Sequence, residues 1–181
     1  MDKLIKVLEL LNAEGINASI YDEDYKSVKW VNPKGDEYDI LESDIAFCED
    51  KIAWFQSSYE DDHLLVTYEN GIRFQWVPET YNPMFGCECI YLGWRKGALI
   101  FIYLEKHDIY VCSIKGTEVK RHNFHGDHLC IGNDYVSIAV YGFKDRDEVE
   151  LLSLPDLKKK TVSLDCADKL GLRPVHYLGN V

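Results

Sequence analysis

The sequence lacks any apolar run near the roughly 20 residues that a membrane-spanning helix needs. Met1-Asp2-Lys3 leads directly into an amphipathic pattern, without the apolar core of a signal peptide. Basic residues are scarce, because 20 lysines and arginines stand against 31 acidic residues, a net charge of −11. Nucleic acids and anionic membranes attract basic patches. We therefore expect a cytoplasmic protein with neither nucleic acid nor membrane as a partner.

Several catalytic signatures are also missing. The chain has no Gly-x-Ser-x-Gly elbow, no Cys-x-x-Cys pair and no glycine-rich phosphate loop, since its 12 glycines are scattered among turns. Its six cysteines are expected to be free thiols, because a protein without a signal peptide stays in a reducing compartment. The sequence therefore predicts a non-catalytic protein without a cofactor.

The chain repeats a pattern of four short strands. Apolar, strand-length runs separated by turn residues recur at a spacing of roughly 40 residues, the period of propeller blades. The pattern predicts complete β-meanders over 45–77, 90–124 and 129–164. Asn70-Gly71 is a strong hairpin signal inside the first of these. The length of 181 residues predicts a single domain, 1–181.

The two ends of the chain are expected to share a fourth unit. Residues 1–15 predict an N-terminal helix over Asp2 to Glu14, with Gly15 as its C-cap. Residues 17–41 then supply three strands. A strand at 175–180 would complete this unit, because Tyr177-Leu178-Gly179 repeats the start of the 90–124 unit. Such pairing would leave no long sheet edge bare.

In this repeated four-strand pattern the chain resembles a small β-propeller. The resemblance implies an all-β fold with one N-terminal helix and about four small blades of antiparallel four-stranded meander, the ends sharing one blade. A β-sandwich or an open partial propeller would produce the same alternation of strands and turns, and both remain as alternatives.

Carboxylates recur in the turn between the second and third strands of each unit, with tyrosines near them. In an up-and-down blade these turns emerge on one face, so the sequence predicts an acidic docking face. Its predicted partner-binding residues are Asp22, Glu23, Asp24, Tyr59, Glu60, Asp61, Asp62, Tyr81, Glu105, Asp108, Asp145, Asp147 and Glu148. Tyr21 and Tyr25 flank the first of these turns.

Such a face is suited to a basic protein partner, since opposite charge steers encounter and tyrosines anchor interfaces. Small size, acidity and the absence of a catalytic motif make the chain similar in type to bacterial immunity proteins. That resemblance implies an inhibitor that blocks the active site of a basic, nuclease-type toxin. Alternatives are a generic propeller-like interaction scaffold and a metal-dependent hydrolase that uses the stretch from His122 to Cys130.

The stretch from His122 to Cys130 contains residue types that zinc accepts. His125 and His128 flank Gly126 and could converge in a turn, so they are weak candidates for metal ligands. Structural zinc draws ligands in pairs from two loops, and no second cluster is evident in the sequence. We therefore expect a polar loop rather than a metal site.

This expectation predicts that the purified protein carries no stoichiometric zinc and that a chelator leaves its melting temperature unchanged. Elemental analysis and thermal unfolding with and without chelator measure both. One equivalent of tightly held zinc, lost in the His125→Ala variant, would contradict the prediction and favour the hydrolase alternative.

Overall fold

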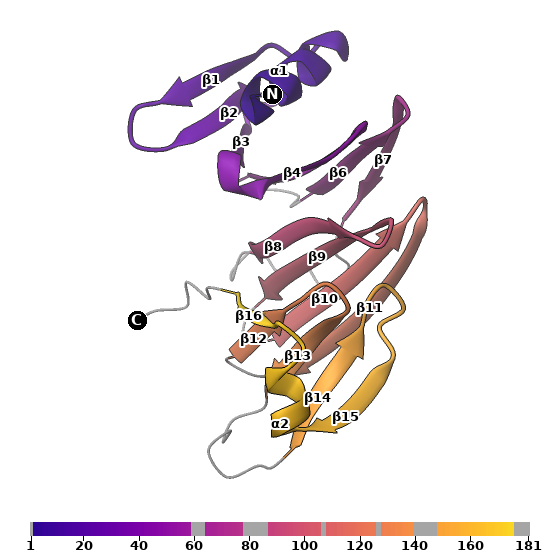
Figure 1. Cartoon of the computed structure of the whole chain (residues 1–181). Helices are drawn as coiled ribbons and strands as arrows, with labels where there is room; N and C mark the ends of the chain where they lie inside the picture. The colour runs from indigo at the N-terminus through magenta and orange to yellow at the C-terminus, as the bar shows by residue number, and fades with distance from the viewer. Residues whose placement is uncertain are drawn as a thin grey trace. The chain divides into compact units, whose positions relative to one another are not determined.

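The computed structural model describes residues 2–58, 64–77, 87–105, 108–125, 128–139 and 148–175. The chain divides into two compact units, Met1–Gly86 and Cys87–Val181 (Figure 1). The first contains the N-terminal helix and seven strands, and the second contains nine strands and a short helix among the described residues. That both units form one domain stays a prediction.

The N-terminal helix α1 (Lys3–Ala13) forms as predicted. Its N-cap is Asp2, whose side chain accepts hydrogen bonds from the backbone N–H groups of Leu4 and Ile5 at 3.0 and 3.4 Å. These bonds satisfy two of the donors that a helix leaves free at its start. Gly15 follows the helix with φ +83°, a left-handed conformation that glycine adopts without steric cost.

Seven strands of the N-terminal unit form one antiparallel sheet. They are β1 (Ala18–Asp22), β2 (Lys26–Val31), β3 (Glu37–Leu41), β4 (Ile45–Cys48), β5 (Lys51–Ser58), β6 (Leu64–Glu69) and β7 (Ile72–Trp76). Strands β1 to β3 are one meander, and β4 to β7 are another. Asn70 and Gly71 join β6 to β7 with φ of 52° and 75°, the positive values that the hairpin signal predicts.

Strand β5 joins the two meanders. It has eight residues, whereas β4 has four and pairs only with residues 51–54. Ser57 and Ser58 pair instead with Asp39 and Tyr38 of β3. A single 3-10 turn, η1 (Glu42–Asp44), separates β3 from β4, so both strands run along the same side of β5. Strand β3 therefore supplies backbone partners that the short β4 cannot provide.

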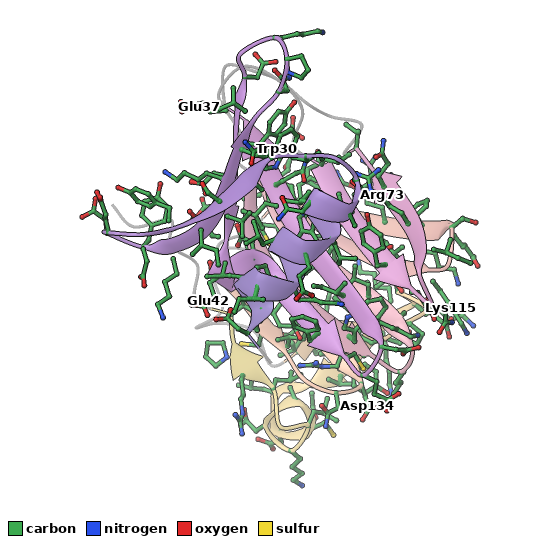
Figure 2. The ribbon with its side chains drawn as sticks, turned by 90° about the horizontal axis from the view of Figure 1, so that it is seen from above. Trp30, Glu37, Glu42, Arg73, Lys115 and Asp134 are labelled. Atoms are coloured by element: carbon green, nitrogen blue, oxygen red, sulfur yellow. The ribbon has the colours of Figure 1, made fainter. Side chains whose placement is uncertain are left out.

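One face of this sheet is covered by α1. The helix buries Leu4, Val7 and Leu11 in a cluster with apolar side chains from β2 to β6. The sheet residues of the cluster are Val28, Ile40, Ile45, Ile52, Trp54, Val66 and Tyr68. Arg73 of β7, labelled in Figure 2, also forms an ion pair with Glu14, just after α1, with 3.1 Å between Nε and Oε1. This ion pair connects the end of the helix to β7, the edge strand at the opposite end of the sheet from β1.

The C-terminal unit contains two antiparallel sheets. The first has the order β11-β10-β9-β8, and the second has the order β15-β14-β13-β12-β16. The strands of the first are β8 (Cys87–Arg95), β9 (Ala98–Glu105), β10 (Asp108–Lys115) and β11 (Glu118–His125). Those of the second are β12 (His128–Ile131), β13 (Tyr135–Ala139), β14 (Glu148–Ser153), β15 (Lys159–Ser163) and β16 (Arg173–Pro174).

These two sheets share a hydrophobic core. Ile100, Ile102, Ile109 and Val111 of the first sheet belong to one buried cluster with Leu129, Ile131, Val136 and Leu152 of the second. Successive side chains of a strand point to opposite faces, so Leu151 of β14 faces away from this core. There it packs with Ala167 of the short helix α2 (Leu164–Asp168), which the sequence pattern did not predict.

The predicted strand at 175–180 falls mostly outside the described residues. Its one described residue, Val175, donates its backbone N–H to the carbonyl of Leu129 at 2.9 Å. Arg173 and Pro174 of β16 pair with β12 just before it. The start of this segment therefore lies beside β12. Pairing of the remainder with the N-terminal strands stays a prediction.

The predicted fold class, all-β with one N-terminal helix and antiparallel meanders, is confirmed. Among the described strands, the backbone pairings do not close into a propeller ring or a barrel. Separate blades are also not observed in the N-terminal unit, because β3 pairs with β5 and merges the first two meanders.

The packing of α1 predicts a strong dependence of stability on Leu11, which is 1% exposed. Leu11→Ala should lower the free energy of unfolding by about 2–5 kcal/mol, because it leaves a cavity against the sheet. Ile5→Ala, at a position of the same helix that is 47% exposed, should change it by at most about 0.5 kcal/mol. Urea unfolding of both variants measures the difference, and equal losses would contradict this packing.

Candidate protein-binding site

The excess negative charge of the chain lies in its N-terminal unit. Residues 1–86 carry 18 acidic and 7 basic side chains, whereas residues 87–181 carry 13 of each. The net charge is therefore −11 in the first unit and zero in the second. A basic partner is attracted mainly to the first unit, because Coulomb steering follows the local charge.

The acidic turn Asp22-Glu23-Asp24 is at the tip of the β1–β2 hairpin. All three side chains are exposed, as the predicted docking role requires. Tyr21 donates its hydroxyl hydrogen to Oε2 of Glu23 at 2.9 Å. This hydrogen bond raises the pKa of the Tyr21 phenol above its usual value, so the group stays a neutral donor.

Beside this turn, two tyrosine rings and a carboxylate surround the ammonium group of Lys29. The Lys29 Nζ lies 4.1 Å from the ring centroid of Tyr21 and 5.1 Å from that of Tyr25. It donates to the Tyr25 hydroxyl at 3.0 Å and lies 3.9 Å from Oδ2 of Asp39. We call the three residues around Lys29, which are Tyr21, Tyr25 and Asp39, the tyrosine cage.

The cage depends on the register of three strands. Lys29 pairs with Asp39 across β2 and β3, and with Ser19 across β1 and β2, which makes Tyr21 its diagonal neighbour. Val28 and Ile40, one residue before Lys29 and one after Asp39, face α1 in the core. Side chains alternate along a strand, so the cage lies on the opposite face of the sheet.

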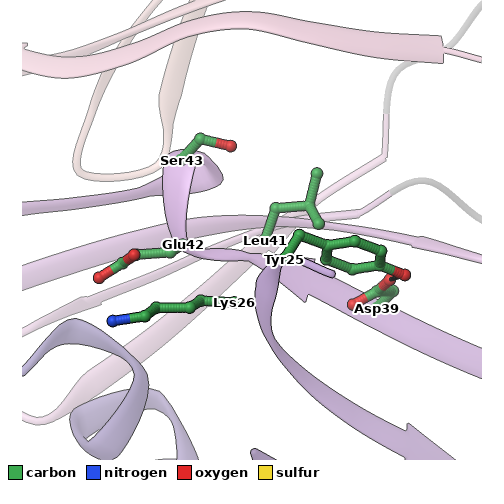
Figure 3. A pocket seen from close by; sticks show the side chains of 6 residues that line it. All are labelled: Tyr25, Lys26, Asp39, Leu41, Glu42 and Ser43. Atoms are coloured by element: carbon green, nitrogen blue, oxygen red, sulfur yellow. Dashed lines mark hydrogen bonds between the residues drawn. The ribbon is translucent and has the colours of Figure 1, made fainter. Parts of the chain in front are cut away.

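The cage continues into an open groove of about 500 Å³ (Figure 3). The groove is lined by Tyr25, Lys26, Asp39, Leu41, Glu42 and Ser43. Figure 3 shows Lys26 and Glu42 side by side along one part of it, and the Tyr25 hydroxyl against the Asp39 carboxylate at 3.1 Å. The groove thus offers two carboxylates, a phenol and the Lys26 ammonium next to an apolar leucine.

One oxygen of the cage has no partner. Oδ2 of Asp39 accepts the Tyr25 hydroxyl, whereas Oδ1 is buried and has no hydrogen-bond partner. The Tyr25 hydroxyl accepts a hydrogen bond from Lys29 and thereby raises the pKa of the Lys29 ammonium above its usual range, so Lys29 stays charged. A buried carboxylate oxygen without a donor is unusual in folded proteins, and it has unused capacity to accept a hydrogen bond.

The other predicted docking residues differ in exposure. Glu148 begins β14 and is exposed, whereas Glu105 ends β9 and is 5% exposed. Asp108 pairs with Glu105 in the register of β9 and β10 and is partly buried. A buried Glu105 presents little of its carboxylate to a partner. Tyr59, Glu60, Asp61, Asp62, Tyr81, Asp145 and Asp147 lie outside the described residues.

Sequence reasoning missed Lys29, Asp39 and the groove residues Lys26, Glu42 and Ser43. The turn predicted at Asn32 to Gly35 joins two predicted strands, but counting back from it places Lys29 opposite Tyr38. In the structure Asp36 also belongs to the turn, where its carbonyl accepts the backbone N–H of Asn32, and the pairing shifts by one residue so that Lys29 lies opposite Asp39. No sequence signal identified the groove, because η1 brings Glu42 and Ser43 to it through an interruption of the strand.

The predicted metal candidates are at strand ends. His125 ends β11 and His128 begins β12, and their side chains are outside the described set. Within the described part of the chain, no group of three or more His, Cys, Asp or Glu side chains is placed to hold a metal ion. The prediction that this stretch binds no metal is not tested by this observation.

The free thiols of Cys48, Cys112 and Cys166 differ in exposure. Burial raises the pKa of the Cys112 thiol to about 12, with Arg121 opposing the effect. Cys112 is therefore protonated at neutral pH and is not a nucleophile. Cys48 and Cys166 are free and exposed.

Comparison with known proteins found no family model, no curated protein and no solved structure that matches the chain. No helix in the ranges that the structure describes is long and apolar enough to cross a membrane.

His122 of β11 predicts a pH dependence of stability. Burial, with a smaller contribution from Lys159, lowers the pKa of His122 below its usual value of 6.5, while Glu150 opposes this. The unfolded chain therefore binds the proton more readily than the folded chain. This contribution to stability is present above pH 6.5 and is lost as pH falls through the lowered pKa.

The melting temperature should accordingly fall more on acidification from about pH 7.5 to about pH 5 in the natural protein than in the His122→Gln variant. Calorimetry at a series of pH values measures the two slopes. Identical slopes would show that His122 titrates alike in the folded and unfolded chains.

Proposed function

We propose that this protein is a non-catalytic, acidic binding module that docks on a basic protein through its N-terminal unit. The most concrete form of the proposal is a cytoplasmic immunity protein that neutralises a basic, nuclease-type bacterial toxin by covering its active site. The observation that carries it is the concentration of the whole charge excess, −11, in residues 1–86.

Electrostatics makes this partner class a good fit. Nucleases hold the phosphates of their substrate with lysine and arginine side chains, so their clefts are basic. A unit with 18 acidic and 7 basic residues is complementary to such a cleft, as the nucleic acid itself is. Complementary charge raises the association rate by about 10 to 1,000-fold, which benefits an inhibitor that must act before the enzyme does.

The β1–β2 hairpin adds exposed aromatic and apolar side chains, which can anchor a partner, to the negative charge of the N-terminal unit. Tyr25 is 44% exposed and Ile20 is 42% exposed, both near the acidic tip Asp22-Glu23-Asp24. Tyrosine is enriched at the centres of interfaces because it buries a large area and has few rotatable bonds. Hydrogen bonds to Glu23 and Asp39 restrain Tyr21 and Tyr25 before any partner arrives, which lowers the entropy lost on binding.

A generic interaction scaffold differs from an immunity protein in its partner. The immunity proposal predicts a basic nuclease domain encoded next to the gene of this protein, and predicts that co-expression with the protein protects cells from it. Neighbouring genes without such a domain, or a nuclease that kills cells equally with and without the protein, would contradict it.

A charge reversal at the hairpin tip tests the docking surface. Changing Asp22, Glu23 and Asp24 together to Lys should leave the fold intact, because exposed turn charges contribute little to stability. Association with the nuclease should slow by about tenfold or more and become less sensitive to salt. Stopped-flow kinetics at two ionic strengths measures both effects.

The matched control changes three exposed carboxylates of the C-terminal unit, Glu118, Asp165 and Asp168, to Lys. Both triple variants alter the net charge equally, so only location distinguishes them. The control should associate at nearly the natural rate. Equal slowing by both variants would mean that net charge alone matters and that the hairpin is not the docking site.

A further inference from the structure

The tyrosine cage is a complete site for a cation, and its present occupant belongs to the chain itself. Two ring faces, a hydroxyl and a carboxylate oxygen lie within 3.0 to 5.1 Å of the Lys29 ammonium. Aromatic rings with a nearby carboxylate are the usual surroundings of a bound ammonium or guanidinium group. Tyr21 of β1, Asp39 of β3 and Tyr25 of the β1–β2 turn hold these groups, so the site is built by the sheet and its hairpin turn.

Lys29 fits this site incompletely. Its ammonium is 3.9 Å from Oδ2 of Asp39, longer than a hydrogen bond, and Oδ1 remains buried without a donor. An ammonium is a point charge that engages one oxygen well. A guanidinium is planar, donates in parallel to both oxygens of a carboxylate and stacks on aromatic faces. The free Oδ1 and the two rings therefore match arginine better than lysine.

The groove provides a route into the cage from solvent. Tyr25 and Asp39 belong both to the cage and to the groove of about 500 Å³. Leu41 offers an apolar contact for the carbon stem of an incoming side chain. Glu42 adds a second carboxylate, with the Lys26 side chain beside it. The Lys29 side chain is 39% exposed, so it can leave toward water. Its exposed ion pair and ring contacts hold it only weakly.

We propose that the tyrosine cage is the subsite for an arginine side chain of the partner, and that the Lys29 ammonium is a stand-in which the arginine displaces. This inference rests on the proposed docking of a basic protein and names the side chain that the hairpin receives. In the bound state the guanidinium donates to both oxygens of Asp39 and lies against Tyr25, while Lys29 moves out to solvent.

The test uses a small probe, so that it does not depend on finding the partner. Nα-acetyl-arginine amide is titrated into the full-length protein, and backbone amide NMR shifts of β2 and β3 are followed. The uncharged isostere Nα-acetyl-citrulline amide should not bind. Nα-acetyl-lysine amide should bind more weakly than the arginine probe, because it cannot engage both oxygens of Asp39.

Two substitutions of Lys29 should act in opposite directions. Lys29→Met empties the cage and should tighten binding of the arginine probe by about tenfold, because an internal occupant reduces the fraction of binding-competent molecules. Lys29→Arg fills the cage with the proposed guanidinium, so it should abolish probe binding and raise the melting temperature. Asp39→Asn should abolish binding, and Tyr25→Phe should weaken it without a change of charge.

Lys34→Met is the matched control for charge, since Lys34 is an exposed residue of the β2–β3 turn. It should leave probe affinity unchanged. Equal gains from Lys29→Met and Lys34→Met, or equal binding of the arginine and citrulline probes, would overturn the cage as an arginine site. If the probe fails while the hairpin reversal still slows nuclease association, this inference is wrong and the proposed function stands.

Discussion

The register between β2 and β3 is the constraint on which the candidate site depends. It places Lys29 opposite Asp39 on one face and Val28 opposite Ile40 on the other. Both apolar residues belong to the core under α1, so the burial of Val28 and Ile40 holds the register in place. A slip of one residue would turn the apolar side chains outward and disperse the tyrosine cage. The stability of the helix–sheet core and the geometry of the candidate site are therefore linked.

The two units of the chain use charge differently. The N-terminal unit is strongly acidic, and the self-repulsion of its charges works against compactness, while the same charge is the basis of the proposed docking. The C-terminal unit is neutral overall. Two of its lysines, Lys159 and Lys160, lie on β15, which is an edge strand of its sheet. Charged side chains on an edge strand discourage pairing with other chains. The acidity of the first unit thus supports the proposed docking, whereas the edge lysines of the second unit oppose pairing of its sheet with other chains.

The sequence pattern predicted the helix and the strands well but predicted their association less well. Alternation of apolar and polar residues identified the meanders, and Asn70-Gly71 adopts the predicted hairpin conformation. The merger of the first two meanders was not predicted, because it depends on β5 being longer than β4 and on the turn η1 that returns β3 to the same side of β5. The helix α2 was also missed, since its five residues are too few for a periodic pattern.

The sequence by itself determined the class of fold, the acidic character of the chain and the position of the tip Asp22-Glu23-Asp24 in a turn. Each of these depends on residues that are neighbours along the chain, through alternation, turn chemistry or simple charge counting. Only the tertiary structure decided that Lys29 is enclosed by Tyr21, Tyr25 and Asp39, and that one carboxylate oxygen is buried without a donor. These contacts join three strands whose register and facing side are set by burial against α1, and burial is a property of the packed molecule rather than of any single segment.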